Sequence, residues 1–291
     1  MLTDTTLVLG GGGLWGAAWM TGLLMGLEES DLDLRHPRAV IGTSAGSVVG
    51  AQLTSNLSTQ ELFERQVDPQ RQAHQTAPDA DNQATAFGLF AKQWSDPNER
   101  LAAICDLALK ATTISWAQRH ADIVGRLGPS SNEWPATPLT ITAVDIDTRE
   151  LRTFDANSGI DLADAIAASC AVPGVWPIAP IGGRRYIDGG VWRTAENVHL
   201  AVGASKVLIL SPFGRAQPAR AGEVSMLAND VAALRARGAK VVLVAADQAS
   251  LASLKGKGAL DPATRRPSAD AGRIQGRKEA ADLKAAFGGC D

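Results

Sequence analysis

One serine in this chain stands in a setting that suits nucleophilic chemistry. Residues 42–46 read G-T-S-A-G and directly follow the apolar run at 39–41, and residues 48–53 then show a helical pattern. A strand, a sharp turn and a helix form the context in which a G-x-S-x-G motif exposes a serine hydroxyl. The pattern predicts Ser44 as a nucleophile, with Gly42 and Gly46 allowing the backbone to turn tightly.

A glycine-rich loop near the N-terminus is a second candidate element. The strand-like run at 7–9 leads into four glycines at 10–13, and Gly16 follows before a helical pattern. A strand, a glycine loop and a helix present backbone N–H groups that bind an anion. We favour an oxyanion hole in which Gly11, Gly12 and Gly13 donate to a tetrahedral intermediate formed at Ser44.

Other interpretations of this glycine loop are weaker. The spacing G-x-G-x-x-G at 11–16 fits a dinucleotide fingerprint, but that fingerprint requires an acidic residue at the end of the next strand. The next strand here runs into Gly42 instead. A phosphate-binding P-loop requires a lysine after its glycines, and this loop has none. A tight turn that only packs helix against strand is the remaining alternative.

An acidic residue at the end of a later strand completes the set. Asp188, Gly189 and Gly190 follow the strand-like run at 184–187. An acid in this position can point into a site at the carboxyl edge of a sheet. Taken alone, the same residues also fit an ordinary Asp-Gly turn.

These three motifs, in this order, resemble the patatin-like phospholipase family over roughly residues 5–212. A fourth segment at 169–177, S-C-A-V-P-G-V-W-P, is similar to the S-x-A-x-P-x-x-F-P segment of that family, with Trp176 in the aromatic position. The resemblance implies an α/β fold, a three-layer α/β/α sandwich with a mostly parallel central sheet. It also implies a Ser–Asp dyad and lipid acyl hydrolase activity.

The histidines of the chain are consistent with a dyad. A triad histidine of a hydrolase of this class follows the acid along the chain. Among the four histidines, only His199 lies after Asp188, and it falls in a stretch that reads as a helix. We therefore expect Asp188 to accept the Ser44 proton directly, and His199 to be a partly exposed helix residue.

Tryptophans near the motifs suggest a binding pocket. The family loop carries a basic residue where this chain has Trp15, and Trp176 and Trp192 flank the other motifs. We consider that these three side chains line an acyl-chain pocket, with core packing as the alternative. A pocket wall at Trp15 predicts a preference for neutral or short-chain esters over strongly anionic phospholipids.

Length and composition restrict the class of protein. The 291 residues carry a formal net charge of −3 and no dense basic cluster, so we expect no nucleic-acid partner and no nucleotide. Three cysteines lack metal-type spacing, and we predict no metal and no cofactor. Neither a signal peptide nor a transmembrane run is evident, which favours a cytoplasmic protein. A basic helix at 274–287 is either solvated or a peripheral contact with an anionic membrane.

Apolar runs alternate with helical patterns along the chain, as in a mostly parallel sheet covered on both faces. We expect a single domain over 1–291. Region 57–135 is interpreted as a helical cap or lid-like insertion, with a polar connection at 68–97 and helices at 98–128; an ordinary helical layer is the alternative. The expected strands are residues 5–9, 38–42, 138–144, 184–187, 206–211 and 240–246.

The function favoured by the sequence is a serine acyl-ester hydrolase of phospholipase A type that acts on lipids. A general carboxylesterase or a thioesterase on the same dyad is the alternative within enzymes. A catalytically silent lipid-binding protein that keeps the fold is the alternative outside them.

Overall fold

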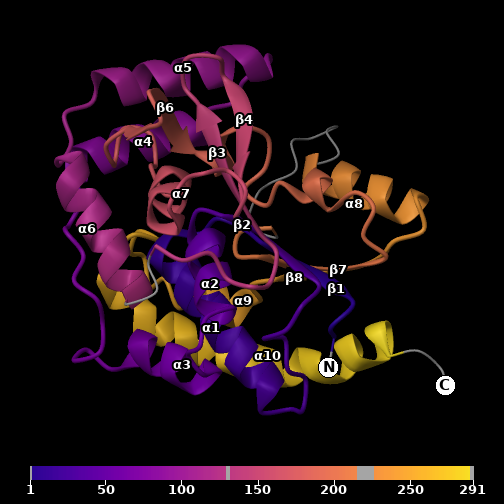
Figure 1. Cartoon of the computed structure of the whole chain (residues 1–291). Coiled ribbons are helices and arrows are strands. Elements are labelled where there is room, and N and C mark those ends of the chain that lie inside the picture. The colour runs from indigo at the N-terminus through magenta and orange to yellow at the C-terminus, as the bar shows by residue number, and fades with distance from the viewer. Residues whose placement is uncertain (1, 129–131, 215–225, 289–291) are drawn as a thin grey trace.

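The computed structural model describes residues 2–128, 132–214 and 226–288. Within them the chain forms an eight-stranded sheet in the order β5-β6-β3-β2-β1-β7-β8, with β4 paired to β3 (Figure 1). Strands β3, β2, β1, β7 and β8 run parallel, while β4, β5 and β6 pair antiparallel. The strands are β1 (Thr5–Leu9), β2 (Ala39–Thr43), β3 (Leu139–Asp145), β4 (Glu150–Phe154), β5 (Ala179–Ile181), β6 (Arg184–Asp188), β7 (Lys206–Ser211) and β8 (Lys240–Ala245).

Helices connect and cover these strands. Short 3₁₀ turns occur at Gly189–Val191, Val198–Ala201 and Pro262–Thr264. The α-helices are α1 (Gly13–Glu28), α2 (Ala45–Leu53), α3 (Thr59–Val67), α4 (Ala80–Ala91), α5 (Pro97–Lys110), α6 (Trp116–Leu127), α7 (Leu162–Ser169), α8 (Met226–Ala236), α9 (Gln248–Ala252) and α10 (Arg265–Phe287).

Alternating side chains of the strands enter two separate hydrophobic clusters, which makes three layers. Leu7 and Leu9 of β1 pack with α1, α2, α7 and α10 on one face of the sheet. Val8, between them, packs with α8 and the 3₁₀ turn at Val198–Ala201 on the other. Successive strand side chains point to opposite faces, so the uninterrupted apolar pattern of β1 is that of a strand covered twice. The predicted three-layer α/β/α sandwich is confirmed.

Close packing of two helices joins the ends of the chain. In Figure 1 the yellow helix α10 lies along the indigo helix α1. A Cβ placed on Gly22 of α1 would lie 2.0 Å from the carbonyl oxygen of Ala269, and one on Gly272 of α10 would lie 2.3 Å from that of Trp19. The glycines therefore let the two backbones touch, and α10 completes the layer over α1.

All six expected strands are present within a residue or two, whereas β4 and β5 were missed. Both missed strands are antiparallel and lie beside β3 and β6. The β4 pattern, ELRTF, is interrupted by charge, and β5 has only three residues, with a proline in the middle. Helices also occupy region 57–135, including α4 within the stretch interpreted as a polar connection.

Part of that region belongs to the layers of the sandwich. Leu101 and Ile104 of α5 pack against Val144 and Ile187 of the sheet, as an ordinary covering helix does.

Two basic side chains of the C-terminal helix α10 pair with an acidic residue of the protein. Arg273 and Arg277 of α10 both form ion pairs with Glu29, next to the end of α1. None of the helices found in the described residues combines the length and apolar character needed to cross a bilayer.

Candidate active site

The ends of two strands meet beside β3, and this meeting places Ser44 next to Asp188. Strand β2 pairs with β3 as far as Thr43 and Thr142. Strand β6 pairs with the next part of β3, beginning at Ala143 and Asp188. Because β4 occupies the opposite edge of β3 along the same residues, β6 continues on the side where β2 stops. The carboxyl ends of β2 and β6 therefore face each other.

Ser44 sits at the sharp turn that the sequence predicted. Its backbone has φ 52° and ψ −116°, an arrangement that costs energy for a residue with a side chain. Ser44 is the N-cap residue of α2, but its hydroxyl makes no capping hydrogen bond. Its backbone N–H instead donates to Ser169 Oγ at 2.8 Å. The turn thus leaves the Ser44 hydroxyl free for another partner.

The glycines of this turn are required by close approach of the backbone. A Cβ on Gly46 would lie 1.9 Å from the carbonyl oxygen of Leu9, so α2 packs directly on β1. A Cβ on Gly42 would lie 2.7 Å from the Cα of Ser47. Neither position accepts a side chain without moving the main chain, which explains both glycines of the motif.

The Asp188 carboxyl group is the partner of the Ser44 hydroxyl. Burial raises the pKa of Asp188 from 3.8 to about 6, and a hydrogen bond from Ser44 opposes that rise. The backbone N–H of Gly190 also donates to Asp188 Oδ1 at 2.8 Å. A carboxylate with a pKa near 6 is a stronger base than an exposed one and is still ionised at neutral pH.

Around the dyad, one buried asparagine ties three segments together. Asn197 Nδ2 lies 3.1 Å from Thr43 Oγ1, 3.3 Å from Thr142 Oγ1 and 3.2 Å from the carbonyl oxygen of Gly189. These contacts link the ends of β2 and β3 to the turn after Asp188. Sequence reasoning missed Asn197 because two of its partners, Thr43 and Thr142, come from segments far away in the chain.

The glycine-rich loop lies beside the nucleophile. A Cβ on Gly11 would be 3.5 Å from Ser44 Cβ. The N–H of Gly11 is occupied by a 2.9 Å hydrogen bond to the carbonyl oxygen of Ala195, whereas no hydrogen bond of the Gly12 N–H is found among the described residues. Gly13 begins α1. The Gly11 N–H is thus engaged within the protein, and Gly12 and Gly13 stay as the predicted oxyanion donors.

The three tryptophans have different environments. Trp15 is fully buried, stacks on Phe213 at 5.0 Å and donates its indole N–H to Ser253 at 2.8 Å. Its role is therefore packing, and the expected preference for neutral esters loses its basis. Trp176 is buried beneath Arg119, while Trp192 is half-buried and lies against His199.

None of the four histidines forms a hydrogen bond or ion pair with Ser44 or Asp188 in the described part of the chain. His199 lies in a 3₁₀ turn instead of the expected helix, with its ring 5.4 Å from that of Trp192. Burial lowers its pKa. His120 pairs with Asp164 at 3.0 Å, which ties α6 to α7.

A buried arginine that sequence reasoning missed lies near the dyad. Arg119 of α6 has its guanidinium carbon 4.2 Å from the centre of the Trp176 ring, and its Nε and Nη1 atoms have no hydrogen-bond partner. Burial lowers its pKa to about 10, and the charge of Asp188 acts in the opposite direction. The sequence did carry a signal for Arg119: it is a charged residue on the face of an amphipathic helix that otherwise points inward.

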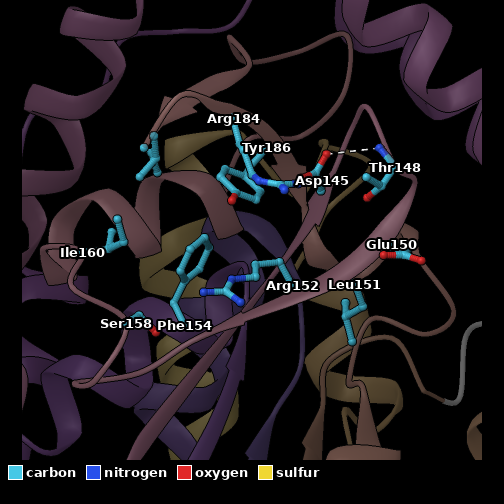
Figure 2. Close-up of a pocket in the computed structure, with 12 residues that line it drawn as sticks. Asp145, Thr148, Glu150, Leu151, Arg152, Phe154, Ser158, Ile160, Arg184 and Tyr186 are labelled. Carbon is cyan, nitrogen blue, oxygen red and sulfur yellow. Dashed lines mark hydrogen bonds and ion pairs between the residues drawn. The ribbon is translucent and has the colours of Figure 1, made fainter.

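A cavity of about 460 Å³ lies on the antiparallel side of the sheet, away from the dyad. Figure 2 shows Arg152, Arg184, Tyr186 and Phe154 along its wall, and neither Ser44 nor Asp188 lines it. Arg184 and Asp145, both in its lining, form an ion pair at 2.7 Å. This cavity is separate from the candidate active site.

The fold and the turn together define an α/β protein with a serine–aspartate pair at the carboxyl edge of its sheet. The family model described as patatin-like phospholipase matches residues 7–201. The chain belongs to the patatin-like phospholipase family and thus to a class of hydrolase enzymes.

Solved structures also match this chain at low sequence identity. VipD from Legionella pneumophila is 11% identical with a TM-score of 0.48, over 96% of this chain and 67% of its own. ExoU in complex with SpcU, from the type III secretion system of Pseudomonas aeruginosa, is 17% identical with a TM-score of 0.41, over 98% of this chain and 53% of its own. The chain therefore spans about half of ExoU. The comparison with curated proteins gave no significant match.

Proposed function

We propose that this protein is a serine acyl-ester hydrolase of phospholipase A type that uses Ser44 and Asp188 as a dyad. The observation that carries the proposal is the hydrogen bond by which the Ser44 hydroxyl, placed on a strained turn, lowers the pKa of the buried Asp188 carboxyl group. Membership of the patatin-like phospholipase family supports an acyl lipid as the substrate.

The first half of the proposed reaction forms an acyl-enzyme. Asp188 accepts the hydroxyl proton as Ser44 Oγ attacks the ester carbonyl carbon. Negative charge develops on the carbonyl oxygen, and the N–H groups of Gly12 and Gly13 at the start of α1 stabilise it. Asp188 then gives its proton to the leaving alcohol as the C–O bond breaks.

The second half releases the acid. Water attacks the acyl group on Ser44 while Asp188 accepts a proton, and the collapse of the intermediate returns that proton to Ser44 Oγ. Asp188 is held by the Gly190 N–H, so both half-reactions use one fixed base.

Labelling with a fluorophosphonate, alongside turnover of p-nitrophenyl hexanoate, tests the nucleophile. Wild-type protein should label and turn over, and Ser44→Ala should do neither. Ser55→Ala, just after α2, is the matched control and should behave as wild type. Labelling of the Ser44→Ala variant would contradict the assignment, and an unreactive, folded wild type would favour the silent lipid-binding alternative. Thioester and neutral-ester panels separate the remaining esterase alternatives.

A further inference from the structure

A pocket of about 170 Å³ opens between the first turns of α1 and α2. Leu14 and Ala17 of α1 and Val48 and Gln52 of α2 form its inner wall. Its outer wall carries four arginines contributed by three separate segments of the chain. They are Arg65, Arg71, Arg126 and Arg265.

The lining of this arginine pocket includes no carboxylate. Arg71 is neutralised by Glu64 and Asp68, which lie outside the lining. Arg265 donates instead to neutral groups, to Gln66 Oε1 at 3.0 and 3.1 Å and to the carbonyl oxygen of Arg65 at 2.9 Å. Three of the four cations thus have no ion-pair partner among the residues that the structure describes.

Arg126 has the least compensated charge. Its carbonyl oxygen accepts from Gln52 and from Arg65, but no hydrogen bond or ion pair of its guanidinium group is found in the described residues. Burial lowers the pKa of Arg126. Burial also lowers the pKa of Arg265 to about 10, and the charge of Arg126 adds to that effect. Arg126 and Arg265 are both partly desolvated, and their charges repel each other. A bound anion would offset the cost of desolvation and the cost of repulsion.

The arginine pocket starts one helical turn from the nucleophile. Val48 follows Ser44 by four residues, and its backbone N–H donates to the Ser44 carbonyl oxygen at 3.4 Å, so the wall of the pocket begins one helical turn after the nucleophile. Leu14 directly follows the glycine loop. Arg119 and Arg126 lie seven residues apart on α6, and Arg119 interacts electrostatically with Asp188. Positive charge therefore extends from the pocket to the dyad.

We propose that the arginine pocket binds the phosphate group of a phosphate-bearing acyl ester and so positions its ester bond at Ser44. Planar guanidinium groups match the oxygens of a phosphate and form strong charge-assisted hydrogen bonds with it. In a glycerophospholipid, a short glycerol unit separates the phosphate from the ester, so a phosphate held at the Val48 end of the pocket would place the ester bond beside Ser44. This proposal rests on the proposed hydrolase function and names its substrate class.

Turnover of two esters with the same acyl chain tests it. In Arg126→Gln, kcat/KM for dihexanoyl phosphatidate should fall about tenfold, mainly through KM, while turnover of p-nitrophenyl hexanoate stays within about twofold of wild type. Arg266→Gln is the matched control, because Arg266 loses the same charge one residue from the pocket and is 69% exposed. Arg266→Gln should leave the turnover of both esters unchanged. Arg126→Lys should restore part of the loss.

Equal losses on the two esters in Arg126→Gln, or no loss on the phosphatidate, would overturn the proposal. If wild-type protein hydrolyses neither ester, the proposed hydrolase function fails instead. A binding measurement then tests separately whether the arginine pocket holds a phosphate group. Calorimetry with Ser44→Ala should show dihexanoyl phosphatidate binding that weakens about tenfold when Arg126→Gln is added. Inorganic phosphate binding as tightly as the phosphatidate would make this a site for free phosphate and overturn the substrate assignment.

Discussion

Asp188 must be ionised to accept the Ser44 proton, and burial makes that ionisation costly. With the pKa of Asp188 raised to about 6, kcat/KM should fall about tenfold per pH unit below that value and level off above it. A pH profile of ester hydrolysis measures this limb. A profile that is flat down to pH 4.5 would show that Asp188 is not the base.

The same carboxyl group links activity to stability. The folded-state pKa of Asp188 lies above its ordinary value of 3.8, so the folded protein loses stability as pH rises from 3.8 through about 6. Asp188→Asn removes that cost, which is on the order of 3 kcal/mol. The variant should lose a thousandfold or so in kcat, yet unfold at a higher urea concentration than wild type at pH 8.

At pH 4 the difference in unfolding between Asp188→Asn and wild type should shrink to well under ~1 kcal/mol, because Asp188 is then protonated in the folded protein and only about half ionised in the unfolded chain. A variant that is destabilised at pH 8 would indicate that the carboxylate contributes to the fold and is not held at a cost.

Arg119 is expected to act on the reaction through Asp188. Its charge lowers the pKa of Asp188 and partly offsets burial. Arg119→Gln should therefore move the acid limb of the kcat/KM profile to higher pH, while activity on a neutral ester above pH 8 changes little. Arg193→Gln, another arginine stacked on a tryptophan but about 39% exposed, is the control. A uniform loss at every pH would give Arg119 a purely structural role.

At the scale of elements, the strand–turn–helix of the nucleophile could be predicted because its whole geometry is local. Gly42, Ser44 and Gly46 lie within five residues, and the two glycines of the motif are those that the close approach of the backbone requires. The pairing of β6 with β3 could not be predicted in the same way. It depends on where β2 ends and on the antiparallel β5–β6 hairpin, whose interrupted pattern is shared by many loops.

The sequence could not predict side chains whose contacts are with residues far away in the chain. Asn197 and Arg119 act through contacts with groups more than fifty residues away. Trp15 shows the converse case, since a residue next to the glycine loop in sequence faces Phe213 and Ser253 in space. Proximity in sequence fixed the backbone near the site but not the direction of this side chain.

The two glycine elements should respond differently to a single added methyl group. Gly11→Ala places a Cβ 3.5 Å from that of Ser44, an ordinary contact, so the protein should fold with a melting temperature near that of wild type. It should lose about tenfold in kcat, because the methyl group takes up space beside the nucleophile and displaces the ester. Gly46→Ala places a Cβ 1.9 Å from the Leu9 carbonyl oxygen and should prevent stable folding.

Thermal melting and ester hydrolysis of both variants measure these effects. Full activity in Gly11→Ala would show that the ester does not occupy the space between Gly11 and Ser44. Gly12 is less informative, because a Cβ there would press on Pro212 and Gly16 at 2.8–2.9 Å and disturb packing before catalysis.

At the scale of the whole molecule, the family match ends at residue 201 but the sandwich does not. Strands β7 and β8 and helix α10 complete the sheet and its cover, and Trp19 of α1 is fully buried with its indole N–H on Gln275 of α10 at 3.0 Å. The C-terminal segment is therefore part of the same core that holds the glycine loop.

Gly272→Ala tests that dependence. The new Cβ would lie 2.3 Å from the carbonyl oxygen of Trp19, so α10 must lift from α1, at a cost of about 3 kcal/mol or more. Because α1 begins at the glycine loop, kcat should fall together with the melting temperature. Gly88→Ala is the matched control: that glycine also lies inside a helix, nothing lies within 4 Å of its added Cβ, and alanine should leave stability equal or slightly higher. Urea unfolding followed by tryptophan fluorescence measures both. Equal stability of the two variants would mean that α10 is not packed on α1 in solution.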